Sequence, residues 1–156
     1  MTVHAEEFLR GLEVEARVTT ERADLFVKGF VQTVFNEIQE GGRYSPGTPE
    51  DTGFARANWY GGINGDGVAP NLAMPVERIR GSLSGEARAA FQQMEETALR
   101  AKAGDVIEGG NNAHYIGYLE HGSSSQAPQG MVRLAILAGQ QIADEVAAHV
   151  MGQRAA

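Results

Sequence analysis

The longest regular pattern in the chain covers residues 5–40, AEEFLRGLEVEARVTTERADLFVKGFVQTVFNEIQE. Its apolar residues recur every three or four positions, as they do on one face of an α-helix. Three β-branched residues, Val18 to Thr20, interrupt this pattern, and Thr20 can cap a second helix. We therefore predict a short helix followed by a long one, ended by Gly41 and Gly42. The two predicted stripes are Phe8, Leu9, Leu12 and Ala16, then Ala23, Val27, Phe30, Val34 and Ile38.

Two more helices are predicted in the second half of the chain. The first begins at Ser84, which can cap it, and ends at Gly104. Its apolar stripe consists of Ala87, Ala90, Phe91, Met94, Ala98 and Ala101. The second is predicted over 130–151, after Pro128. Its buried stripe consists of Val132, Ile136, Gly139, Ile142, Val146 and Val150.

Strand signals are few and short. Phe54–Ile63 includes Trp59 and Tyr60, residue types typical of a half-buried pleated surface. Asp105–Glu108 is a second short strand, whereas Tyr115–Glu120 alternates so weakly that it fits either a strand or a turn of helix. Long helices with few strands predict an α+β fold. We expect a small, mainly antiparallel sheet packed against the long N-terminal and C-terminal helices.

The middle of the chain, 61–85, is an excursion rich in glycine and proline with weak periodicity. Ordering its backbone costs on the order of 1–2 kcal/mol per residue, and the segment has no apolar stripe to offset that cost. We predict that it is mobile in the free subunit and is ordered by neighbouring subunits. The preceding residues, 44–53, have the composition of turns.

Composition sets limits on the class of protein. A chain of 156 residues predicts one domain, 1–156. Its net charge of −7 and the lack of any basic stripe argue against sequence-specific nucleic-acid binding. Without cysteines it has no disulfides or thiolate metal sites, and no apolar run is long enough to span a bilayer. Its first residues are acidic, so we expect a protein kept in the cytoplasm unless a particle carries it out.

Metal and nucleophile patterns are incomplete. Two histidines, His114 and His121, flank Glu120, but their separation does not give the i, i+4 spacing of a helical metal pair. The serines Ser123 to Ser125 follow Gly122 but lack the second glycine of a nucleophile elbow. We predict neither a metal site nor a serine nucleophile here.

Two further patterns also have ordinary explanations. The glycines at 61–67 are followed by no P-loop lysine. Asp51, Thr52 and Gly53 match the triplet of aspartic proteases, but an arginine at position 56 is out of keeping with that class. We therefore predict no catalytic residue and no cofactor, and we keep a small hydrolase or a cytoplasmic regulatory oligomer as alternatives.

Two segments carry a resemblance to a known family: TPEDTGFARANW at 48–59 and NNAHYIGYLEHGSSSQAPQGM at 111–131. They resemble the small tail-completion and neck proteins of long-tailed bacteriophages. The family shows Pro-x-Asp-Thr-Gly-x-x-Arg-x-x-Trp, then Asn-x-x-x-Tyr and Leu-Glu-x-Gly-x-Ser-x-Gln-Ala-Pro-x-Gly-Met. The resemblance implies a structural virion protein, present in the host cytoplasm during assembly, that forms a ring joining tail to head.

By this resemblance the expected partners are copies of the chain itself, in a ring that is most simply a hexamer, and the adjoining neck, connector or tail-tube proteins. We expect Glu120 and the Ser123 to Gln126 turn beside a subunit interface, because polar groups on a turn held by two elements commonly carry recognition. Glu120→Ala is then expected to leave the subunit folded. The candidate interface residues are Arg56, Trp59, Tyr115, Glu120, Ser124 and Gln126.

Overall fold

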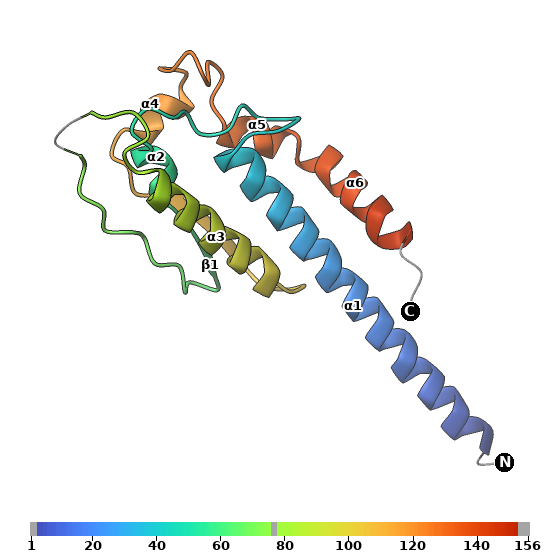
Figure 1. Ribbon diagram of the computed structural model, residues 1–156. Coiled ribbons are helices and arrows are strands. Elements are labelled where there is room, and N and C mark those ends of the chain that lie inside the picture. Colours follow the sequence, from blue (N-terminus) through green and yellow to red (C-terminus); the bar gives the residue numbers. More distant parts are fainter. Residues whose placement is uncertain (1–2, 76–77, 153–156) are drawn as a thin grey trace.

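The computed structural model describes residues 3–75 and 78–152, with side chains from Leu9 onward. Within these residues the fold is α+β, with six helices and a two-stranded antiparallel sheet (Figure 1), which confirms the predicted fold class. The elements are α1 Val3–Gln39, α2 Phe54–Ala57, β1 Trp59–Ile63, α3 Ser84–Arg100, β2 Ile107–Asn111, α4 Ile116–Glu120, α5 Val132–Leu137 and α6 Gly139–Gly152.

The first helix, α1, is continuous over 37 residues, so the predicted break at Val18 to Thr20 is wrong. Thr20 does not cap a second helix. Its hydroxyl donates instead to the carbonyl of Ala16, at 3.0 Å. A threonine can satisfy its hydroxyl in this way inside a helix, and the helix therefore runs through the β-branched residues.

Only the C-terminal half of α1 belongs to the body of the molecule. There α1 contacts α3 and α6, and β1 packs on α3. The core lies between these elements and consists of Val31, Phe35, Ile38, Trp59, Met94, Ala98, Met131 and Ala135.

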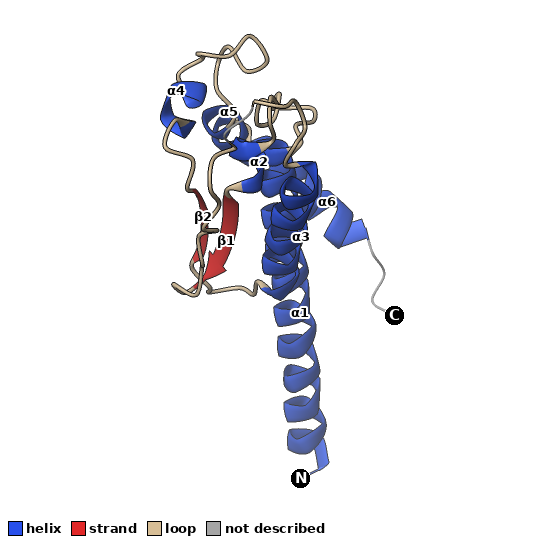
Figure 2. Ribbon diagram, turned by 60° about the vertical axis from the view of Figure 1, so that its left-hand side comes forward, coloured by secondary structure: helices blue, strands red, loops and turns tan. Residues whose placement is uncertain are grey.

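The N-terminal half of α1 projects from this body (Figures 1 and 2). Leu9 is 56% exposed and Leu12 is 50% exposed, and the side chain of Ala16 is exposed as well. These three residues continue the apolar stripe that packs into the core farther along the same helix. Phe8 lies outside the residues whose side chains are described.

The sheet pairs Trp59 with Asn111 at one end and Ile63 with Ile107 at the other. The predicted strand Phe54–Ile63 is therefore wrong in its first half, because Phe54–Ala57 forms the helical turn α2. Gly53 begins this turn with a φ of 89°, a left-handed conformation that favours glycine. The second strand starts two residues later than the predicted Asp105 and continues to Asn111.

Two glycines let the helices approach the sheet. A Cβ on Gly61 would lie 3.1 Å from the side chain of Thr97 in α3. One on Gly109 would lie 3.2 Å from the ring of Phe35 in α1. The strands lack side chains at these positions, so both helices pack directly on the backbone of the sheet.

The predicted helix over 130–151 is two helices, α5 and α6, separated at Ala138. Glycine at position 139 lowers the tendency of a helix to continue. Because of the break, Ile136 is 67% exposed instead of buried, and Ala135 takes the core position. Ser84 likewise does not cap α3, since it is the first residue of that helix and no side chain caps it.

Between β1 and α3 the described residues of 64–83 contain turns and irregular structure. The predicted excursion 61–85 overlaps the end of β1 and the start of α3. Its mobility in the free subunit stays a prediction.

The loop after α1 is held by the carboxylate of Glu37, whose residue is only 6% exposed. Its oxygens accept hydrogen bonds from the backbone N–H groups of Arg43, Tyr44 and Ser45, at 3.0, 3.0 and 2.7 Å. A buried carboxylate needs such donors, and the loop needs an acceptor for its amides. The Glu37 side chain therefore gains donors for its carboxylate and provides the acceptor for the loop amides.

Glu37→Ala should therefore destabilise the subunit by about 1–3 kcal/mol, because three backbone donors lose their acceptor. Glu40→Ala is the matched control, since Glu40 is the exposed acidic residue one turn later. Its effect should stay within about 0.5 kcal/mol. Urea unfolding of both variants measures the difference. Equal stabilities would show that Glu37 does not hold the loop.

Candidate subunit-interface site

The first motif segment, 48–59, is organised around Thr48, a fully buried residue. Its N–H donates to the carbonyl of Gln39 at 3.1 Å, and its hydroxyl donates to the carbonyl of Ile38 at 2.8 Å. The hydroxyl also accepts from the indole N–H of Trp59 at 2.8 Å. Thr48 thus joins the end of α1 to the start of β1.

Two predicted interface residues are already used inside this segment. Trp59 is 5% exposed and belongs to the core. It is therefore a core residue and not an exposed interface anchor. Arg56 donates from Nε to the carbonyl of Thr48 at 2.8 Å and forms an ion pair with Glu50 at 3.1 Å. Its guanidinium fixes the local backbone and is only partly accessible to a partner.

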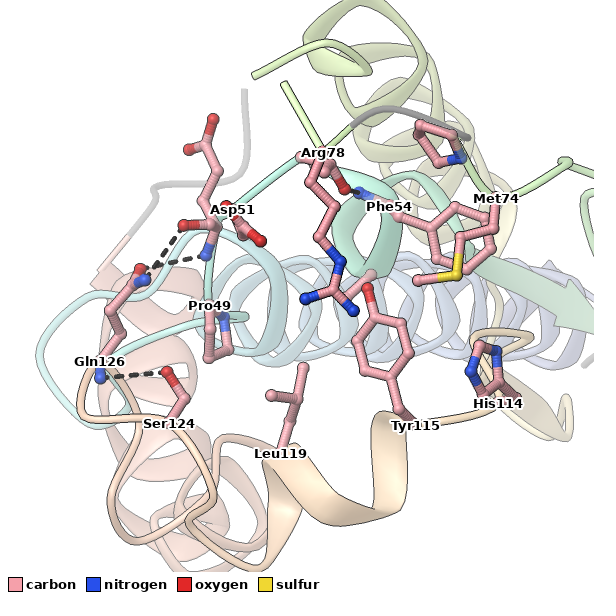
Figure 3. Close-up of a pocket in the computed structure, with 15 residues that line it drawn as sticks. Pro49, Asp51, Phe54, Met74, Arg78, His114, Tyr115, Leu119, Ser124 and Gln126 are labelled. Carbon is pink, nitrogen blue, oxygen red and sulfur yellow. Dashed lines mark hydrogen bonds between the residues drawn. The ribbon is translucent and has the colours of Figure 1, made fainter. Parts of the chain in front are cut away.

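The second motif segment, 111–131, is bound to the first by side-chain amides. Gln126 accepts from the backbone N–H of Glu50 and donates to the carbonyl of Glu50, both at 3.0 Å (Figure 3). Asn111 donates to the carbonyl of Ala55 at 2.7 Å. These amides bind main-chain groups as a neighbouring strand would, and the two segments therefore form one unit.

Glu120 also has a structural role that the sequence analysis missed. Its carboxylate accepts from the backbone N–H groups of Met131, Val132 and Arg133, at 3.0, 2.9 and 2.8 Å. These are the free donors at the start of α5, and Glu120 caps them from a distant segment. Glu120 therefore contributes to the stability of the subunit, and whether Glu120→Ala leaves the subunit folded stays a prediction.

The ionisation of Glu120 follows from these contacts. Burial acts to raise the pKa of its carboxyl, but the three backbone donors and the charge of Arg133 outweigh burial. The net result is a pKa below its ordinary value of 4.5. The carboxylate is charged at neutral pH and complements the positive end of α5.

A cavity of about 360 Å³ lies where the two segments meet (Figure 3). Phe54 and Tyr115 line it with their ring centroids 6.1 Å apart, and Asp51 and Arg78 add charges. Burial raises the pKa of the Tyr115 hydroxyl, and Asp51 also raises it, whereas the backbone of Ala55 and the charge of Arg78 lower it; the net shift is upward. Tyr115 therefore stays protonated at neutral pH.

Three of the residues weighed as catalytic, Asp51, His114 and Ser124, line this cavity. His114 stacks edge-on against Tyr115, with ring centroids 5.1 Å apart. The ring Nδ1 of His121 lies 2.6 Å from the carbonyl of Gly117, within the same turn of chain. The Ser124 hydroxyl accepts from the backbone N–H of Gln126 at 3.2 Å. A hydrolase would need a histidine against a serine hydroxyl. None of these three contacts is of that kind, and the hydrolase stays an alternative.

Among the residues that the structure describes, no group of three or more His, Cys, Asp or Glu side chains is placed to hold a metal ion. The same part of the chain contains no helix both long and apolar enough to cross a bilayer. Of the predicted interface residues, Tyr115, Ser124 and Gln126 border the cavity. Arg56 is bonded to the carbonyl of Thr48, Glu120 to the N–H of Met131, and Trp59 lies in the core.

Comparisons of the chain with protein-family models, with curated proteins and with solved structures found no match.

The cap made by Glu120 predicts a pH-dependent stability. Because its pKa is lowered on folding, its contribution is present above the unfolded pKa of about 4.5 and is lost as the pH falls through the folded value. At neutral pH, Glu120→Gln should cost about 0.5–2 kcal/mol, the range for a lost helix cap. The gap between wild type and variant should close in acid. Urea unfolding from pH 7 downward measures it, and a gap independent of pH would contradict the assignment.

Proposed function

We propose that the protein is a structural virion component of a long-tailed bacteriophage, which forms a ring at the tail top or neck and joins tail to head. The observation that carries this proposal is the union of the two resembling segments. Gln126 and Asn111 bind the second segment to the first, so the residues that carry the resemblance act together as one structural unit.

The form of the subunit supports assembly with other subunits. A rigid body carries a projecting helix whose apolar side chains, Leu9 and Leu12, are about half exposed. In proteins most of the stability of a helix comes from the packing of its apolar face. Exposed apolar residues in a continuous stripe are typical of contact surfaces.

A ring requires that one surface of a subunit bind a different surface of the next. By resemblance the symmetry is that of a tail tube, and the subunits form a hexamer. The net charge of −7 suits a ring around a DNA channel, because an acidic wall repels phosphate instead of holding it. In the same proposal, neighbours order the 61–85 segment.

Locating the subunit in a particle reconstruction tests this function. We expect a ring between the portal and the tail tube. Density for this subunit in the capsid shell or at the tail tip would reject the proposed function.

The projecting stripe gives a mutational test. Leu9→Ser with Leu12→Ser should leave the melting temperature of the body nearly unchanged, because neither side chain packs against it, while incorporation into particles falls at least tenfold. Arg10→Ser with Glu21→Ser is the matched control, since these residues lie off the stripe on the same exposed part of α1. Quantitative blotting of purified particles measures incorporation. Normal incorporation of the leucine variant would remove the stripe from the assembly contacts.

A further inference from the structure

The outer edge of β2 has unpaired main-chain groups. The bonds from Asn112 N to Asn58 O and from Asn64 N to Val106 O show that the even-numbered residues of the two strands are hydrogen-bonded to each other. In an antiparallel pair, residues whose main-chain groups point toward the partner strand alternate with residues whose groups point away from it. The N–H and C=O groups of Ile107, Gly109 and Asn111 therefore point away from β1.

On the other edge of the sheet, the outward main-chain groups of Gly61 and Ile63 are bonded within the subunit. On β1, the side-chain amide of Gln93 accepts from Gly61 N and donates to Gly61 O, both at 2.9 Å. Ile63 N donates to the carboxylate of Asp66. In the described part of the chain no group plays this role for β2, which forms the outer border of the sheet in Figure 2. Gly109 on this edge is exposed.

The same chain contains a second segment with unpaired main-chain groups, which could bond to this edge. Residues 68–74 lie outside helices and strands, and Val68 is 79% exposed. Their main chain makes one hydrogen bond among the described residues, from the side chain of Asn112 to the carbonyl of Pro70, at 3.1 Å. Most of the donors and acceptors of this segment are thus free.

Proline at position 70 selects how the segment can pair. Proline has no N–H, so it fits a strand only where that side faces away from the partner strand. Ala69, Asn71 and Ala73 then face the partner together. They match in number and spacing the three residues of β2 whose groups point outward, Ile107, Gly109 and Asn111.

We infer that residues 69–73 of one subunit add as an antiparallel strand to the β2 edge of a second copy of this chain. Asn71 lies opposite Gly109, Ala69 opposite Asn111, and Ala73 opposite Ile107. The main-chain bonds supply the affinity, as in other cases of strand addition to a sheet edge.

The acceptor is a second copy because the segment is held elsewhere in its own subunit. Val68, Pro70 and Leu72 line a cavity of about 260 Å³ with β1 and α3, while the open edge belongs to β2. Two different surfaces of one chain then meet between copies, which is the contact that closes a ring. The inference rests on the proposed ring in this respect: it names the contact that links neighbouring subunits.

Disulfide trapping tests the register. In the inferred pairing Leu72 faces Glu108 across a non-hydrogen-bonded position, where Cα atoms lie about 4.5 Å apart, within reach of a disulfide. The chain has no cysteine of its own. Chains with Glu108→Cys are mixed with chains carrying Leu72→Cys at a concentration at which sedimentation shows oligomers, then mildly oxidised. Mixing separate variants excludes a bond within one chain.

We expect a heterodimer of the two variants, and a ladder of covalent oligomers when both cysteines are in one chain. Ala73→Cys replaces Leu72→Cys in the control, because the adjacent residue points to the opposite face of the strand, and it should cross-link at least tenfold less. Bonds only between two Glu108→Cys chains would overturn the inference in favour of β2 pairing with itself. Oligomers without any of these bonds would overturn it while leaving the ring intact, whereas a chain that is monomeric at every concentration would also reject the proposed function.

A second measurement covers the case in which Leu72→Cys disturbs folding. Asn71→Pro removes a central donor of the inferred strand, and Val68→Pro removes one that faces away from it. Both should melt like the wild type, because neither N–H is bonded to another of the described residues. Only Asn71→Pro should shift the sedimentation profile towards monomer, by tenfold or more in apparent Kd. Equal effects of the two prolines would overturn the inference.

Discussion

The structure depends first on the burial of Thr48, a single polar residue at the junction of three segments. Its hydroxyl donates to Ile38 and accepts from Trp59, and its carbonyl accepts from Arg56. Buried polar groups are tolerated only when they are bonded, so this position requires the end of α1, the α2 turn and the indole together. The sheet and the first motif segment are in this way placed on the long helix.

The two motif segments are held in place by hydrogen bonds to side chains more than by main-chain bonds of a β-sheet. The sheet has two short strands, and much of the chain around it is loop. Glu37, Glu120 and Gln126 supply acceptors to backbone amides that no helix or strand engages. The bonds to the two carboxylates are charge-assisted and stronger than neutral ones. Together with the neutral bonds of Gln126, they hold these loops in one conformation. Most of the residues that carry the family resemblance are therefore bonded within the subunit, and we propose that partner contacts lie on the projecting part of α1 and on the open edge of β2.

Periodicity in the sequence was sufficient for the α+β class and for the core face of α1 at Val27, Phe30 and Val34. Periodicity failed to predict the structure where a residue type is compatible with two local structures. Thr20 donates a hydrogen bond within its own helix instead of capping another helix. Gly53 begins a helical turn over Phe54–Ala57, where the sequence predicts a strand. In the site, the polar character of Glu120 suggested exposure, because its three amide partners lie 11 to 13 residues away along the chain. Long-range acceptors of this kind leave no local pattern to detect.

Native-state hydrogen exchange of the free subunit tests whether distant carboxylates hold the loop after α1 and the second motif segment to the body. The amides of Ser45 and Met131 report on it, because each donates to a distant carboxylate. We expect both to be protected nearly as strongly as the buried part of α1, opening only with the whole subunit. Exchange of these two amides at the rate of an exposed loop, with α1 still protected, would contradict it.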